Sequence, residues 1–191
     1  MNFDKQVALK WVQANLVWFC VTLTVALLLK HHYSVSSSDA LRWILQPTAG
    51  LVEVLSNTPF ILERGEGYVN YSNMLIIAKS CAGINFLILT ICMMTYHVIP
   101  LLKNWQQKIV ALVGIGITAY LVAIVANTVR ILIAMQLYAA KIHFGFLTPD
   151  RLHRMEGIAV YFGALWLMYA MIQKLTQKNS SQIQGGNTCY A

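Results

Sequence analysis

Residues 109–126 read "IVALVGIGITAYLVAIVA" and contain no charged side chain. A run of about 20 apolar residues is long enough, as an α-helix, to cross the hydrocarbon core of a bilayer. Three further runs, 12–29, 84–102 and 158–172, are also predominantly apolar. Together these segments predict an all-α polytopic membrane protein.

The composition of the whole chain also indicates a membrane protein. Of its 191 residues, 58% are hydrophobic and 11% are charged, and the mean hydropathy is +0.58. Soluble domains carry about 25% charged residues. We expect a single integral membrane domain, residues 1–175, because this length leaves no room for a separate soluble catalytic domain. Residues 176–191, "TQKNSSQIQGGNTCYA", are polar and predict a disordered cytoplasmic tail.

The formal net charge is +7, from 14 Lys and Arg against 7 Asp and Glu. In membrane proteins, basic loop residues orient the helices and contact anionic lipid headgroups. No RNA- or DNA-binding module accompanies the charge. We therefore expect the lipid bilayer, and not nucleic acid, as the partner of these residues; the oligomeric state stays open.

Two other apolar segments are less regular. Residues 41–62 are interrupted by prolines, a glycine and polar residues, and can form a spanning, re-entrant or interfacial helix. Residues 131–142 are too short to span alone, so we expect a bundle of about 4–6 transmembrane or re-entrant helices. In residues 63–78, "ERGEGYVNYSNMLIIA", two glycines precede β-favouring residues. This pattern predicts a short extracytoplasmic hairpin or irregular loop.

Lysines beside the apolar runs predict the topology, because cytoplasmic loops carry an excess of basic residues. They place both termini and the loop at 103–108 in the cytoplasm, through Lys5, Lys10, Lys103, Lys108, Lys174 and Lys178. The outer ends of the last three spans then share the extracytoplasmic face of the cell (inner) membrane. Lys30, Arg42 and Arg64 would also lie outside, against the rule. If 41–62 spanned, the N-terminus would move outside and the later spans would keep their orientation.

Cys81 is the first candidate for chemistry on that face. It precedes the apolar run at 84–102, where helix-end amides favour an anion, and a thiolate is the reactive form of cysteine. The glycine of the following "AG" lets a substrate or another backbone approach closely. The alternative is a small packing residue, as we expect for Cys20 and Cys92 in apolar runs. No Cys or His spacing typical of a metal site or disulfide framework occurs, and no cofactor is expected.

Arg130 is the second candidate, because an arginine within an apolar stretch is costly unless it pairs or reaches the interface. It could stabilise an oxyanion or bind a carboxylate, or it could be a cation that stops transfer at a helix end. Asn127 precedes it by three residues, on the same face if the helix continues. Asn127 could orient Arg130 or donate a hydrogen bond itself.

His153 is the third candidate, just before the last span, where it can act as base and acid for a thiol. The alternative is an ordinary interfacial histidine, and His143 is a rival for the role. Glu156 could orient His153 or pair with Arg154, and Gly157 permits close helix packing. A nucleophile, a base and an electrostatic stabiliser on one face fit acyl transfer through a thioester.

The motifs "SCAGINF" (80–86), "NTVRI" (127–131) and "HRMEG" (153–157) occur in this order at the ends of apolar segments. The set resembles the exosortase/archaeosortase family of membrane transpeptidases, and "CAGINF" is most similar to the exosortase K subtype. "PTAGLVEVLSNTPF" (47–60) and "GEGY" (65–68) resemble the extracytoplasmic segment before the cysteine in that family. The resemblance covers about residues 45–163 and implies catalytic Cys81, Arg130 and His153.

The resemblance further implies a cysteine protease or transpeptidase that processes membrane-anchored, exported proteins. Their C-terminal sorting signal would be PEP-CTERM-like: a short motif, a transmembrane helix and a basic tail. Two other function classes stay open: a small non-enzymatic membrane assembly subunit, in which Cys81 would tolerate replacement, and an anion- or lipid-handling transporter, in which Arg130 would bind the anion.

Overall fold

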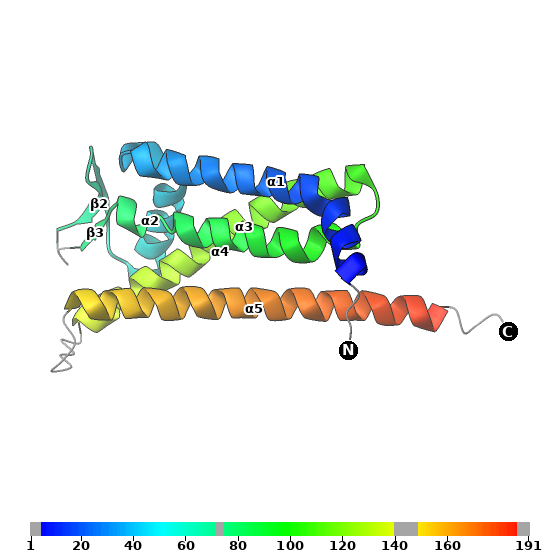
Figure 1. Ribbon diagram of the computed structural model, residues 1–191. Helices are drawn as coiled ribbons and strands as arrows, with labels where there is room; N and C mark the ends of the chain where they lie inside the picture. The colour runs from blue at the N-terminus through cyan, green and yellow to red at the C-terminus, as the bar shows by residue number, and fades with distance from the viewer. Residues whose placement is uncertain (1–4, 72–74, 140–148, 187–191) are drawn as a thin grey trace.

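The computed structural model describes the backbone of residues 5–71, 75–139 and 149–186, and the side chains of 13, 15–71, 75–138, 155–174 and 176. The chain is mostly helical (Figure 1). Its main helices are α1 (Lys5–Val35), α2 (Arg42–Ser56), α3 (Ile84–Val98), α4 (Trp105–Ala139) and α5 (Pro149–Gly186). Short 3-10 turns are η1 (Asp39–Leu41), η2 (Lys79–Cys81) and η3 (Ile99–Leu101).

The long helices form a bundle with distinct ends. In Figure 1, α1, α3 and α5 run alongside one another and α4 crosses behind them. Helix α3 packs on α1 and α4, and α4 also packs on α2 and α5. Helix α1 begins and α5 ends at one end of the bundle, and the small β-sheet lies at the other (Figure 1). We call these the terminal end and the sheet end.

Four helical segments in the described part of the chain are long and apolar enough to cross a membrane, by length and composition alone. They are Asn15–Val35, Lys79–Leu101, Trp105–Tyr138 and Met155–Lys174. Each contains most or all of one of the four runs that the sequence predicts to span. Many of their apolar side chains are exposed, as expected for helices that face lipid.

Helix α4 is longer than the sequence predicts. The apolar runs 109–126 and 131–142 were expected to be separate, but α4 continues without a break from Trp105 to Ala139. The helix accepts Asn127 and Thr128 between the runs because both are buried and hydrogen-bonded: Thr128 Oγ1, for example, donates to the Ile124 carbonyl at 2.9 Å. Arg130 therefore lies within a helix and not at its end.

Helix α2 occupies part of 41–62, and its 15 residues span about 22 Å, less than a bilayer core. Asn57 ends it in the left-handed conformation at φ 52°, which asparagine tolerates. Its buried residues recur at helical spacing and face α4: Ile44, Leu45, Thr48, Ala49 and Val52. Tyr120 of α4 stacks on Trp43, and its hydroxyl donates to the Trp43 carbonyl at 2.6 Å.

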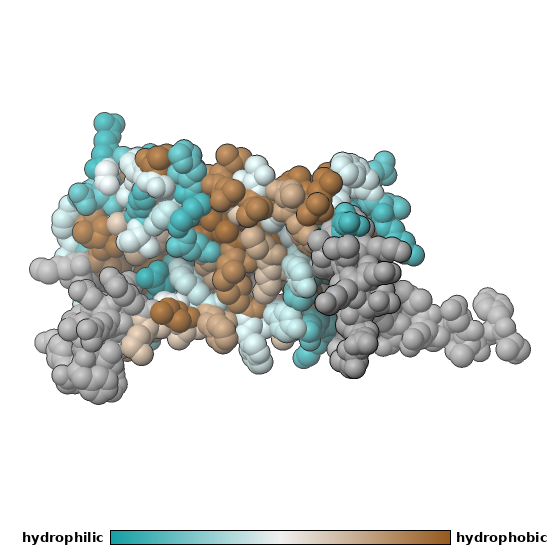
Figure 2. Space-filling model, in the orientation of Figure 1, coloured by the Kyte–Doolittle hydropathy of each residue, from teal (hydrophilic) through white to brown (hydrophobic). Residues whose placement is uncertain are grey.

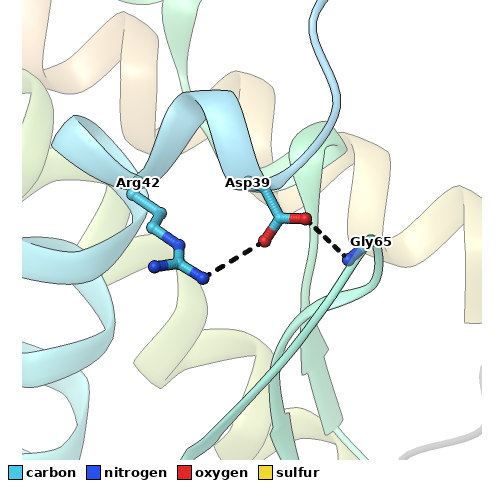
Figure 3. Close-up of polar contacts among 3 residues, drawn as sticks. All are labelled: Asp39, Arg42 and Gly65. Atoms are coloured by element: carbon cyan, nitrogen blue, oxygen red, sulfur yellow. Dashed lines mark hydrogen bonds and ion pairs between the residues drawn. The ribbon is translucent and has the colours of Figure 1, made fainter.

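A three-stranded antiparallel sheet, β1 (Ile61–Glu63), β2 (Gly67–Asn70) and β3 (Leu75–Ile77), occupies the segment expected to hold a hairpin or loop. Val69 of the central strand faces Ile61 on one side and Ile76 on the other. Asp39 fixes the sheet to η1, because its Oδ2 accepts from the Gly65 N–H at 3.0 Å while Oδ1 meets Arg42 at 3.4 Å (Figure 3). Strand β3 leads directly into η2 and Cys81.

Helix α5 continues to Gly186, ten residues beyond Thr176. The sequence predicted disorder from Thr176 onward because the composition becomes polar. The backbone of 176–186 is instead helical, which fits the absence of proline and of glycine before Gly185. Residues 187–191 lie outside the described part of the chain.

Candidate functional site

Cys81 lies in the turn η2, which is fixed to the end of α1. The Cys81 N–H donates to the Ala78 carbonyl at 2.8 Å, closing the turn. Lys79 Nζ donates to the carbonyls of Ser34 and Ser36 at 3.0 and 2.7 Å. The thiol is half-buried, and the Ser80 Oγ lies 4.0 Å from its sulfur. These bonds hold the segment that carries Cys81 against the residues at the end of α1.

Gly83 makes the junction between this turn and α3. Its φ is +65°, the left-handed region that favours glycine, and it is the N-cap of α3. A Cβ at this position would lie 3.3 Å from the Tyr161 hydroxyl and 3.6 Å from Asn127 Cγ. The sequence predicted clearance here for a substrate or another backbone. The structure places two side chains of the chain itself close to this glycine, which also lines a cavity.

Asn127 connects α4 to the cysteine. It is only 1% exposed, and its Nδ2 donates to the main-chain carbonyl of Cys81. Its Oδ1 accepts a hydrogen bond from the Tyr161 hydroxyl at 2.9 Å. Asn127 therefore acts on the Cys81 backbone and reaches Arg130 only through Tyr161.

Tyr161 of α5 is the residue that sequence reasoning missed. Its hydroxyl donates to Asn127 and accepts from Arg130 Nη1 at 3.3 Å, which uses its one donor and an acceptor site. The Arg130 guanidinium carbon lies 5.5 Å from the Tyr161 ring centroid. The ring stacks on Phe86 of α3, with centroids 4.8 Å apart and planes at 18°. Tyr161 therefore links α3, α4 and α5 at one point.

A signal for Tyr161 existed in the sequence. Tyr161 follows Gly157 by four residues and His153 by eight, so all three positions share one side of a helix. Buried tyrosine hydroxyls usually find a hydrogen-bond partner. An aromatic residue in an apolar membrane segment is nevertheless common, and nothing in the sequence distinguished it from the neighbouring aromatics of α5.

Arg130 lies against α5 at Gly157. A Cβ at Gly157 would stand 2.8 Å from Arg130 Nε, so glycine is what allows this approach. The Glu156 carboxylate and the Arg130 guanidinium attract each other. The sequence suggested that Glu156 could orient His153 or pair with Arg154, and the structure places the Glu156 charge near Arg130.

His153 occupies the beginning of α5, one helical turn before Gly157. Its side chain lies outside the described part of the chain, as does the side chain of Arg154, and His143 lies entirely outside it. The structure therefore brings together Cys81, Asn127 and Arg130 of the predicted site. It places the backbone of position 153 next to the turn that contacts Arg130.

A cavity of about 470 Å³ adjoins this cluster. Its walls come from α1, η2, α3, α4 and α5 and include Ser80, Gly83, Arg130 and Tyr161. Cys81 is not itself in the lining, although the residues on either side of it in the chain are close to the cavity. Among the residues that the structure describes, no group of His, Cys, Asp and Glu could hold a metal ion.

The fold and the site define a mostly helical protein with four apolar helices of membrane-spanning length and a cysteine tied through buried polar groups to an arginine. Comparison with protein-family models, with curated proteins and with solved structures found no match to this chain.

Proposed function

We propose that the protein is a membrane-embedded cysteine endopeptidase or transpeptidase of the exosortase type. The observation that carries the proposal is the hydrogen-bonded path from the Cys81 main-chain carbonyl through Asn127 and Tyr161 to Arg130, which joins the turn that carries the thiol to a guanidinium that lines the cavity. These bonds hold the backbone at Cys81 relative to Arg130. Burying these polar groups within an otherwise apolar bundle would cost free energy if they were not hydrogen-bonded to one another.

The proposed reaction begins when the Cys81 thiolate attacks the scissile carbonyl carbon of a peptide. A carbon–sulfur bond forms, and Arg130 stabilises the negative charge that develops on the oxygen. The carbon–nitrogen bond then breaks, and His153 gives its proton to the leaving amine. Water or an acceptor amine then attacks the thioester carbonyl carbon and passes a proton to His153, the carbon–sulfur bond breaks, and the Cys81 thiolate and protonated His153 are restored.

In this proposal the sheet end faces away from the cytoplasm. The lysines at 103, 108 and 174 belong to the terminal end, and cytoplasmic loops are enriched in such residues. Substrates would be exported proteins that carry a short motif, a transmembrane helix and a basic tail, with the motif presented near Cys81.

The experiment is co-expression with reporters that share a transmembrane helix and basic tail and differ in the motif before the helix. Wild-type protein should shorten at least one reporter, and Cys81→Ala should leave that reporter intact while still inserting in the membrane. Cys92→Ala, a matched change in α3, should process normally. Processing by Cys81→Ala at the wild-type rate would reject the mechanism and favour a non-enzymatic role for this segment.

A further inference from the structure

Two lysines border the cavity where it meets the end of α1. Lys30 Nζ lies 5.6 Å from the centroid of the Tyr33 ring, and Lys79 Nζ lies 5.1 Å from it. Lys30 Nζ also donates to Asn85 Oδ1 at 2.7 Å. Tyr33 and Asn85 both line the cavity, so each ammonium group lies beside a residue of its wall.

Both lysines retain capacity to bind an anion. An ammonium group has three N–H donors. Lys79 uses two on the carbonyls of Ser34 and Ser36, and Lys30 uses one on Asn85. Among the described residues, the polar contacts of Lys30 and Lys79 are with carbonyl oxygens and with the Tyr33 ring, and none is with a carboxylate.

Part of the lining of the same cavity is apolar. Leu89 of α3 and Ile158 and Leu165 of α5 contribute to it. Leu89 is 52% exposed and Ile158 is 69% exposed, so the cavity opens onto the outer surface of the bundle. Figure 2 shows hydrophilic residues toward both ends of the bundle and a hydrophobic area between them. Arg130 also lines the cavity, and the Glu156 carboxylate attracts its guanidinium.

We propose that this cavity binds an anionic glycerophospholipid. The phosphate would lie against Lys30 and Lys79, and an acyl chain would follow Leu89, Ile158 and Leu165. Lys30 lies five residues before the end of α1, so in a bilayer it would stand near the headgroups while the apolar wall faced the hydrocarbon. The volume of the cavity is within the range of about 300–1,000 Å³ typical of small-molecule sites.

A lipid fits better than an acidic peptide, because a peptide held at the lysines would leave the exposed apolar wall uncovered. The surrounding bilayer also supplies the lipid at high local concentration. The inference is independent of cysteine chemistry: it concerns the lysine edge and the apolar wall, and it holds whether or not Cys81 is a nucleophile.

The test uses the full chain in a neutral detergent and native mass spectrometry. Phosphatidylglycerol and phosphatidylcholine with identical acyl chains are titrated separately, and phosphatidylglycerol should bind more tightly. Each lysine near a charged headgroup contributes about 1 kcal/mol, so Lys30→Gln with Lys79→Gln should weaken phosphatidylglycerol binding roughly 30-fold. Lys103→Gln with Lys174→Gln removes the same charge at the terminal end and should leave the affinity unchanged.

A second variant covers the case in which the double variant fails to fold. Lys30→Gln alone keeps the contacts of Lys79 to α1 and should weaken binding about fivefold. Equal affinity for the two lipids, or equal losses in the control, would overturn the proposal. Soluble glycerol phosphate and an acidic peptide are tested as competitors. Displacement of the lipid by glycerol phosphate, or by the peptide at a concentration below that of the lipid, would show that no acyl chain is bound. The lysines would then bind another anion.

Discussion

The side-chain amide of Asn127 donates a hydrogen bond to the main-chain carbonyl of Cys81, 46 residues earlier in the chain. This bond joins the turn that carries the thiol to the helix that carries Arg130. Tyr161 then joins the same asparagine to the guanidinium. The position of the cysteine relative to the arginine therefore depends on a few buried polar groups whose removal can be tested one at a time.

Asn127→Ala removes the bond to Cys81 and leaves its carbonyl and the Tyr161 hydroxyl without this partner. We expect the free energy of unfolding to fall by about 1–3 kcal/mol and reporter processing to fall strongly. Thermal unfolding in detergent and the reporter assay measure the two effects. Thr128→Val is the control, because the Thr128 hydroxyl bonds to a carbonyl of its own helix. If Thr128→Val lost as much processing as Asn127→Ala, the bond from Asn127 to Cys81 would not explain the loss.

Tyr161→Phe deletes the hydroxyl while keeping the ring that stacks on Phe86. The hydroxyl bonds both Asn127 and Arg130, so we expect a stability loss of about 1 kcal/mol and a fall in the rate of processing. The loss should appear in the maximal rate more than in the reporter concentration at half-maximal rate, because a positioning residue does not bind the substrate. Tyr169→Phe, about two helical turns further along α5, should process normally. Normal processing by Tyr161→Phe would show that the hydroxyl does not position Arg130.

Gly157→Ala places a methyl group 2.8 Å from the present position of Arg130 Nε. The guanidinium has to move, so we expect a folded protein with slower processing. Gly163→Ala lies on the same helix with no atom within 4 Å of its new Cβ, and it should be neutral or stabilising by up to about 1 kcal/mol. Similar rates for the two variants would contradict the proposed role of Arg130.

Gly83→Ala tests the junction before α3. At φ +65° an alanine costs about 1–2 kcal/mol, and its Cβ would crowd the Tyr161 hydroxyl at 3.3 Å. Thermal unfolding should show this loss. Gly50→Ala in α2 meets nothing within 4 Å and should not lower stability. A stable and active Gly83→Ala variant would mean that the turn carrying Cys81 can adopt another path.

The sequence predicted the elements that depend on long apolar runs, because about 20 such residues in succession have few other structures open to them. It did not predict that 109–126 and 131–142 belong to one helix. The polar residues between them resemble a helix end, and only their burial against other elements makes a continuous helix favourable. Tertiary contacts of this kind are not visible in local composition.

The candidate site was predicted in part. Polar or charged residues within membrane segments carry a free-energy cost and are therefore candidates for function. This reasoning selected Cys81, Asn127 and Arg130. Tyr161 could not, since its role depends on how α5 lies against α3 and α4. The contacts of Gly83 with Tyr161 and Asn127 could not be predicted either, since no spacing in the sequence indicates them.

The central claim is that Cys81 forms a covalent thioester with its substrate. Purified protein is mixed with a processed reporter, quenched in acid within the first turnover and digested for mass spectrometry. The account predicts the reporter fragment on the peptide that contains Cys81, its release by hydroxylamine, and its absence from Cys81→Ala. Continued processing with no adduct on Cys81, together with normal processing by Cys81→Ala, would contradict it.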